Sequence, residues 1–123
     1  MNNQIPEIEQ VIRDYLSAWN TSDQEQRSSI MSKVLASNCL YADSHLPDLI
    51  ETPELHSQFI AQFRSKFPEL KISLVSTPDI HHNFFRFRWQ LTKPDGNIFT
   101  QGMFFGEFNQ QQEIVKLVGF VDQ

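Results

Sequence analysis

Apolar and polar residues alternate through three runs at the end of the chain, and short polar segments separate these runs. They are FFRFRWQL at residues 84–91, IFTQGMFFGEF at residues 98–108 and EIVKLVGFVD at residues 113–122. A period of two is typical of strands with one buried face. KPDG joins the first two runs and NQQQ joins the last two, and both are turn-like compositions. The pattern therefore predicts three consecutive antiparallel strands.

The first half of the chain has helical spacing instead. Apolar residues recur every three to four positions from Ile5 to Trp19, and a second helix is expected from Asp23 to Ala36. Thr52 followed by Pro53 is a cap-then-proline start for a third helix. The apolar stripe expected on that helix is Leu55, Phe59, Ile60, Phe63 and Phe67.

Two further strands are expected between these regions, at residues 39–42 and 70–77. The predicted order is helix, helix, strand, helix and then four strands. Helices gathered on one side of an antiparallel sheet make an α+β fold. With so many aromatic residues in the sheet, we expect it to curl into a cone with a pocket inside.

The register of the first predicted hairpin has two solutions. Pro94, Asp95 and Gly96 favour a three-residue loop with Gly96 in the left-handed conformation, which places Arg88 opposite Gly102. A two-residue turn would instead place Trp89 opposite Gly102. The choice matters because a slip of one residue exchanges the two faces of a strand.

The two faces of the first long strand differ in character. Phe85, Phe87, Trp89 and Leu91 share one face, which is the better candidate for the side that the helices cover. The other face carries a polar group that is expected to be solvated or to form a dimer interface, with the arginines paired to acids such as Glu107. This group comprises Arg86, Arg88, Gln90 and Gln101.

Length and composition narrow the class of protein. A chain of 123 residues is expected to form a single domain, 1–123, with one core. The net charge of −5 argues against a nucleic-acid partner, and no apolar run is long enough to span a membrane. Cys39 is the only cysteine, so no intrachain disulfide can form, and a cytoplasmic location is the default expectation.

The ordered combination of several segments resembles the nuclear transport factor 2-like superfamily, and within it the branch of SnoaL-like polyketide cyclases and ketosteroid isomerases. The matching segments are VIRDYLSAWNTSD, NCLYAD, FIAQFRSKFPEL, RFRWQLTKPDG, QGMFFGEFN and IVKLVGFVD. The resemblance implies a cone-shaped barrel that is open at one end. It also implies a homodimer formed through the outer face of the sheet.

The same resemblance implies roles for two residues. Tyr15 matches the tyrosine that donates a hydrogen bond to the reacting oxygen in the steroid isomerases, although it also fits the apolar stripe of its helix. Asp43 matches the carboxylate that abstracts a proton, and a partly desolvated carboxylate at a cavity edge suits a general base. The alternative for Asp43 is a loop aspartate that caps a turn.

Phe104 departs from the pattern of this branch. The match of GMFFGEFN places it where the isomerases carry a protonated aspartate, the arrangement that serves as a standard example of a neutral carboxylic acid donor. Phenylalanine can neither donate a hydrogen bond nor take a proton. Asp43 and Tyr15 would therefore act alone or with a different partner.

Aromatic residues from several elements are expected to line an apolar pocket for a small ligand. They are Trp19, Phe63, Trp89, Phe104 and Phe120. No cofactor is expected, and metal binding is not expected, because the spacing of the loop cluster His45, Asp43, Asp48 and Glu51 imposes no convergence. His81 and His82 would point to opposite sides of an extended segment, and His56 has no second histidine four positions later on its helix.

Three hypotheses about function follow. The first is a cofactor-free isomerase, cyclase or hydratase that acts on a small apolar carbonyl compound, with Asp43 as the base. The second is a ligand-binding protein with the same pocket and no chemistry. The third is a dimeric interaction module of the same fold.

Overall fold

A computed structural model describes residues 7–122 of the chain, and Ile5 of the first predicted helix lies outside this range. The helices are α1 (Ile8–Trp19), α2 (Gln24–Val34) and α3 (Pro53–Lys66). The strands are β1 (Leu35–Ala42), β2 (Lys71–Leu74), β3 (Asp79–His81), β4 (Phe84–Thr92), β5 (Ile98–Phe108) and β6 (Ile114–Val121). The predicted α+β class and the order of the elements are confirmed. The short strand β3 is an addition, in a segment that the sequence pattern indicated only as a turn.

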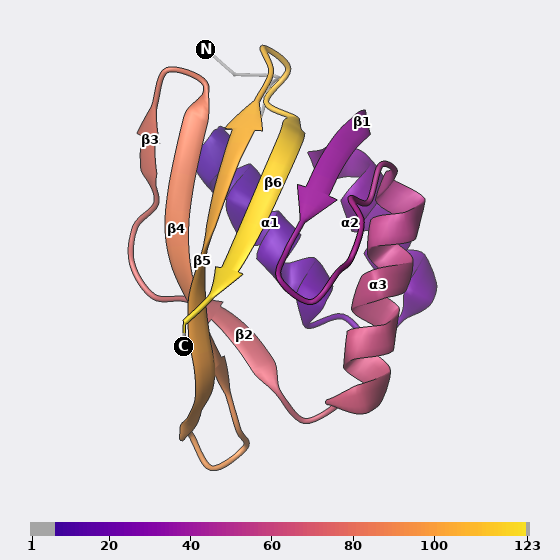
Figure 1. Ribbon diagram of the computed structural model, residues 1–123, viewed down its shortest axis with the longest axis vertical. Helices are drawn as coiled ribbons and strands as arrows, with labels where there is room; N and C mark the ends of the chain where they lie inside the picture. The colour runs from indigo at the N-terminus through magenta and orange to yellow at the C-terminus, as the bar shows by residue number, and fades with distance from the viewer. Residues whose placement is uncertain (1–6, 123) are drawn as a thin grey trace.

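The strands form one curved sheet in the order β1-β6-β5-β4-β2, with β3 also paired to β4. Only the β1–β6 pair is parallel, and the other pairs are antiparallel. In Figure 1, α1 crosses one face of the sheet, while α2 and α3 lie beside its β1 edge. The sheet does not close on itself, so the helices complete the wall of the predicted cone.

The first β-hairpin combines both predicted registers. Lys93 faces Asn97 as in the three-residue loop, and Gly96 has the expected positive φ of 90°. The register then shifts between Leu91 and Thr92, which leaves an extra residue in β5. A bulge of this kind moves all later pairs by one residue. As a result Trp89, not Arg88, lies opposite Gly102.

Glycines on the concave face make room for large rings. A Cβ atom at Gly102 would lie 2.3 Å from Trp89 Cζ2, and one at Gly119 would lie 2.7 Å from Phe104 Cε1. No side chain fits at these distances, so each ring can pack closely against the neighbouring strand. This packing allows a curved sheet to carry several aromatic residues on its inner face.

The core lies between this concave face and the helices. As predicted, Phe85, Phe87, Trp89 and Leu91 are buried on the side that the helices cover. On α3 the predicted stripe is wrong at Leu55, which is 50% exposed, whereas His56 is 1% exposed. The rest of the predicted stripe packs inward, with Ile60 fully buried, and at the first turn of α3 the polar side chain of His56 enters the core in place of Leu55. Within residues 7–122, no helix is long and apolar enough to cross a membrane.

Candidate functional site

A cavity of about 930 Å³ lies between the concave face of the sheet and α3. Its size is within the range of small-molecule sites. Most of its wall is apolar, and its polar groups are few. The aromatic part of the wall consists of Trp19, Tyr41, Phe59, Phe63, Phe67, Trp89, Phe99 and Phe104. The polar part consists of Asp43, His45, Gln62, Ser65, Lys66 and Thr100.

Asp43 is placed in this wall by the end of β1, because the strand stops at Ala42 and the chain turns. Its side chain is 9% exposed. One carboxylate oxygen accepts a hydrogen bond from the backbone N–H of His45 at 2.7 Å, and the other accepts one from the hydroxyl of Tyr41 at 2.6 Å. Asp43 thus caps a turn and borders the cavity at once, so the two alternatives from the sequence are compatible.

Tyr41 was not among the predicted site residues. It lies two positions before Asp43 on the same chain segment, and residues two apart on a strand share a face. Its ring is 2% exposed and lines the cavity, and its hydroxyl donates to the carboxylate of Asp43. The spacing Tyr-x-Asp at the end of a predicted strand was therefore the available signal.

Tyr15 is not brought to the cavity. It is fully buried, and its hydroxyl lies 2.7 Å from Nε2 of His56, which comes from α3. Burial raises the pKa of Tyr15 well above its usual value. Burial also lowers the pKa of His56 to about 3, so this imidazole is neutral at ordinary pH. Tyr15 and His56 form a sealed polar pair behind the cavity wall.

Four of the five predicted pocket residues do lie together. Trp19, Phe63, Trp89 and Phe104 all line the cavity. Phe120 does not, because it faces outward from β6 and is 54% exposed. The prediction of Phe120 as a ligand contact is corrected by strand parity. Its neighbours Gly119 and Val121 face the cavity instead.

Phe104 lines the cavity beside Asp43. A Cβ atom at Gly119 would lie close to both Phe104 and Asp43, at 2.7 Å from Phe104 Cε1 and 3.3 Å from Asp43 Cβ. An apolar ring therefore borders the same small area as the carboxylate. No second proton-transfer group is supplied at this position.

Other groups that could react or bind a metal add little to the chemistry of this site. Cys39 is buried, and burial raises the pKa of its thiol to about 12, so it is not a nucleophile. The part of the chain that the structure describes contains no group of three or more potential metal ligands. The indole N–H groups of Trp19 and Trp89 are buried and have no hydrogen-bond partner within residues 7–122.

Comparison with solved structures identifies similar proteins. A protein of Agrobacterium tumefaciens, described as a candidate isomerase of the SnoaL-like family, is 34% identical and has a TM-score of 0.84, with 93% of this chain and 96% of that chain covered. A candidate ketosteroid isomerase from Kribbella flavida is 14% identical with a TM-score of 0.69, covering 94% of this chain and 78% of that one.

A third similar structure is a candidate SnoaL-like polyketide cyclase from Jannaschia sp., 13% identical with a TM-score of 0.70, covering 98% of this chain and 92% of that one. No model of a protein family and no curated protein matches the chain. The two matches of low identity support the fold alone. The match to the Agrobacterium protein has a higher sequence identity and covers nearly all of both chains, and it shows that this chain belongs to the SnoaL-like family.

Proposed function

We propose that this protein is a cofactor-free isomerase of a small apolar carbonyl compound, with Asp43 as its base. The observation that carries the proposal is the position of Asp43. Its carboxylate borders an apolar cavity of about 930 Å³, and two hydrogen bonds fix its orientation. A fixed base within reach of a bound carbon acid is the main requirement for enolisation.

Isomerisation is a reaction that a single base can carry out. In the isomerisation of an unsaturated carbonyl compound by proton transfer, the carboxylate takes a proton from the carbon between the carbonyl group and the C=C bond, and the bonding electrons move towards the carbonyl oxygen to give a dienolate. The same proton then returns to the far carbon of the dienolate, which shifts the C=C bond and restores the carboxylate. Hydration and many cyclisations need separate acid and base groups. Phe104 supplies no acid or base at its own position, so a mechanism that needs one base, isomerisation, is the member of this set that the site supports best.

A donor is also needed for the developing enolate oxygen. The hydroxyl of Tyr15 is bonded to His56 behind the wall, and Phe104 has no donor. Trp89 also lines the cavity, but its indole N–H is buried, and the ring edge that carries it packs against Gly102. Among the donors that line the cavity, His45 lies beside the base, with Nδ1 4.0 Å from Oδ1 of Asp43, and we assign the donor role to it within this proposal.

The test is deuterium exchange next to the carbonyl group of small cyclic and linear ketones in D₂O, followed by NMR. Asp43→Asn is expected to lower the enzymatic exchange rate by roughly 10²–10⁴-fold with unchanged thermal stability. Asp48→Asn is the matched control, because Asp48 is an exposed aspartate of the same loop and does not line the cavity. Equal exchange by wild type and Asp43→Asn would rule Asp43 out as the base.

The second candidate function is ligand binding without chemistry, and Phe104 is the observation that favours it. It predicts that ketones or related ligands stabilise wild type and Asp43→Asn equally in a thermal-shift assay. It also predicts no exchange above the buffer rate for either protein.

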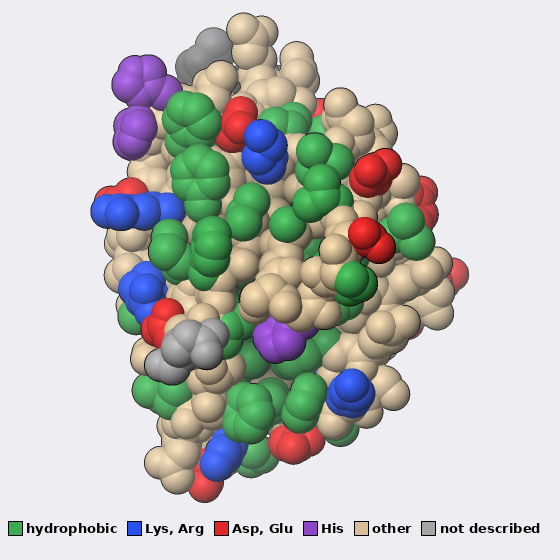
Figure 2. All heavy atoms as spheres, in the orientation of Figure 1, with side chains coloured by type: hydrophobic (Ala, Val, Ile, Leu, Met, Phe, Trp, Pro, Cys, Tyr) green, Lys and Arg blue, Asp and Glu red, His purple; other side chains and the backbone are tan. Residues whose placement is uncertain are grey.

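We further propose a homodimer formed through the convex face of the sheet. Phe84, Phe105 and Phe120 are exposed there, and Phe84 and Phe105 stack with ring centroids 5.8 Å apart. Figure 2 shows hydrophobic side chains gathered over β4, β5 and β6. Sedimentation equilibrium should give a dimer for wild type and a monomer for Phe120→Asp. If wild type is a monomer at high concentration, the dimer proposal fails.

The predicted arginines lie at the edge of this face. Arg86 pairs with Asp79 at 2.9 Å and Arg88 pairs with Asp122, while Glu107 pairs with Lys116 at 3.2 Å. The arginines are therefore on the outer face as expected, but they pair with acids other than the predicted Glu107.

We also propose a cytoplasmic location, because Cys39 is a free, buried cysteine and thiols stay reduced in that compartment.

A further inference from the structure

A second, smaller cavity shares a wall with the main one. This side pocket has a volume of about 390 Å³ and lies between the β4–β5 hairpin and the segment that joins α3 to β2. Phe67 and Phe99 line both cavities. Their ring centroids are 5.8 Å apart, which is within contact range for aromatic rings. The two rings therefore form a partition between the cavities.

Local backbone structure places each ring. Phe67 ends α3, with its backbone N–H bonded to the carbonyl of Phe63 at 2.9 Å, and its ring also packs against the ring of Phe63. Phe99 is the extra residue of the bulge in β5, since Leu91 pairs with Thr100 and Thr92 pairs with Ile98. A bulge redirects a side chain. Phe99 and Thr100 consequently both line the main cavity although they are adjacent on a strand.

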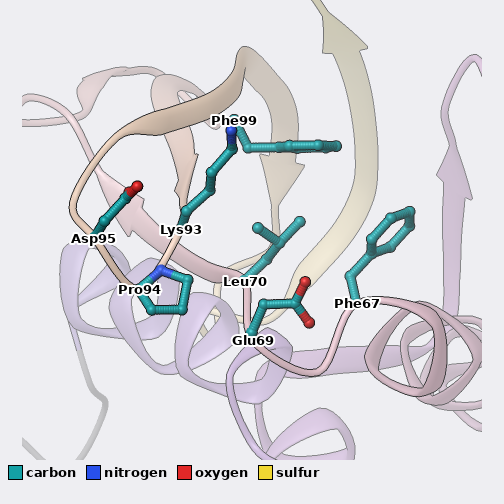
Figure 3. A pocket seen from close by; sticks show the side chains of 7 residues that line it. All are labelled: Phe67, Glu69, Leu70, Lys93, Pro94, Asp95 and Phe99. Atoms are coloured by element: carbon teal, nitrogen blue, oxygen red, sulfur yellow. The ribbon is translucent and has the colours of Figure 1, made fainter.

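The chemistry of the side pocket suits the end of an apolar chain. Figure 3 shows Phe67 and Phe99 on one side of it and Lys93, Pro94 and Asp95 of the hairpin on the other. Leu70 and the ring of Pro94 supply apolar surface. The charged residues that line it have both signs, two acidic and one basic, so the pocket is not an anion site. They are Glu69, Lys93 and Asp95.

We propose that the Phe67–Phe99 partition sets the length of the apolar chain that the main cavity accepts, and that the side pocket is a subsite for the end of longer chains. The ligand class is an uncharged linear carbonyl compound, with its carbonyl group near Asp43 and its tail directed at the partition. This inference rests on the proposed function only for the statement that the cavity binds a carbonyl ligand. It does not depend on Asp43 acting as a base.

Phe99 is the better of the two residues to change. It is 49% exposed, so its removal takes little from the core. Phe99→Ala opens the partition and joins the two cavities. Ile98→Ala is the matched control, because Ile98 is 52% exposed on the same strand and lines neither cavity. Comparing these variants separates the effect of the partition from the loss of exposed apolar surface.

The experiment measures the dissociation constants of linear methyl ketones of about six to about twelve carbons by calorimetry. Each buried methylene group should tighten binding about fourfold until the chain reaches the partition, after which wild-type affinity should level off. In Phe99→Ala the increase should continue, so that the longest ketone binds at least about tenfold more tightly than to wild type. Ile98→Ala should follow wild type.

Identical chain-length profiles for wild type and Phe99→Ala would overturn the inference, and so would the absence of binding of any linear ketone to wild type. Asp43→Asn should keep the wild-type binding profile while losing deuterium exchange. Failure of the partition therefore appears in the chain-length profile. Failure of the proposed function appears in the exchange rate of a short or cyclic ketone that does not reach the partition.

Discussion

Two tyrosine pairs lie next to each other in this molecule and differ in one respect. Tyr15 is bonded to His56 at 2.7 Å, and Tyr41 is bonded to Asp43 at 2.6 Å. The rings of Tyr41 and His56 stack with centroids 3.9 Å apart, so the pairs are in direct contact. Only the Tyr41–Asp43 pair borders the cavity. Similar polar chemistry therefore supports the fold in one pair and is available to a ligand in the other.

The physical cause of the difference is access to the cavity. A buried polar pair with no ligand access can stabilise or destabilise the folded state, but it cannot contact a substrate. Tyr15 comes from α1 and His56 from α3, and neither side chain lines the cavity. Asp43 follows the end of β1, where the chain leaves the sheet beside the cavity. The family resemblance implied a catalytic Tyr15, whereas Tyr41 is the tyrosine that contacts the proposed base, Asp43.

The largest expected effect concerns the sealed pair of Tyr15 and His56. The free energy of unfolding should depend on pH in the acid range. Burial lowers the pKa of His56 to about 3 in the folded state, and an unfolded histidine has a pKa of about 6.5. Below about pH 6.5 the unfolded chain binds a proton that the folded chain does not. The free energy of unfolding should therefore fall as the pH falls towards 3, by roughly 5 kcal/mol at most from this group.

His56→Gln tests this expectation, because glutamine can still bond to Tyr15 and does not titrate. Urea unfolding at several pH values should show a shallower loss of stability between pH 6.5 and pH 3 than in wild type. His45→Gln is the control, since the side chain of His45 is 69% exposed and its loss should leave the slope unchanged. Equal slopes in all three proteins would show that His56 is protonated without unfolding.

The second effect separates stability from activity at Tyr15. Tyr15→Phe removes the hydrogen bond to His56 and leaves the imidazole of a 1% exposed residue without that partner. We expect a loss of about 1–3 kcal/mol in the free energy of unfolding, with ketone exchange changed by less than about threefold. Urea denaturation and the exchange assay measure the two quantities on one sample. A loss of exchange of 100-fold or more would instead support the donor role that the family resemblance implies.

The sequence predicted the elements better than it predicted these contacts. Period-two alternation located β4, β5 and β6, and helical spacing placed Tyr15 inside α1. The burial of His56 was missed because Leu55 is the more apolar neighbour, and only the partner on α1 explains why the histidine turns inward. Contacts between elements far apart in sequence have no local pattern.

The bulge at Phe99 is a second feature that the sequence did not predict. The turn residues Pro94, Asp95 and Gly96 specify the loop, and the loop conformation was among the predicted alternatives. Nothing in the residues beside Phe99 marks the extra position in β5. The shift is explained by packing, because it sets the ring of Trp89 over Gly102, where a side chain would not fit. Register on the concave face was thus decided by ring volume and not by the turn.

The smallest expected effect on stability, and the sharpest test of the comparison, is at Tyr41. Tyr41→Phe keeps the ring against His56 and removes the hydroxyl that donates to Asp43. Asp43 retains the backbone donor of His45, so the cost in the free energy of unfolding should be only about 0.5–1.5 kcal/mol.

The exchange rate at saturating ketone should nevertheless fall about tenfold in Tyr41→Phe, because the carboxylate loses the contact that orients it toward the cavity. The apparent KM should change little, since the aromatic wall is intact. Tyr15→Phe would then be the less stable but active protein, and Tyr41→Phe the more stable but slower one. If both variants lose activity and stability in the same proportion, the two pairs act as one network and the distinction between a sealed pair and a cavity pair does not hold.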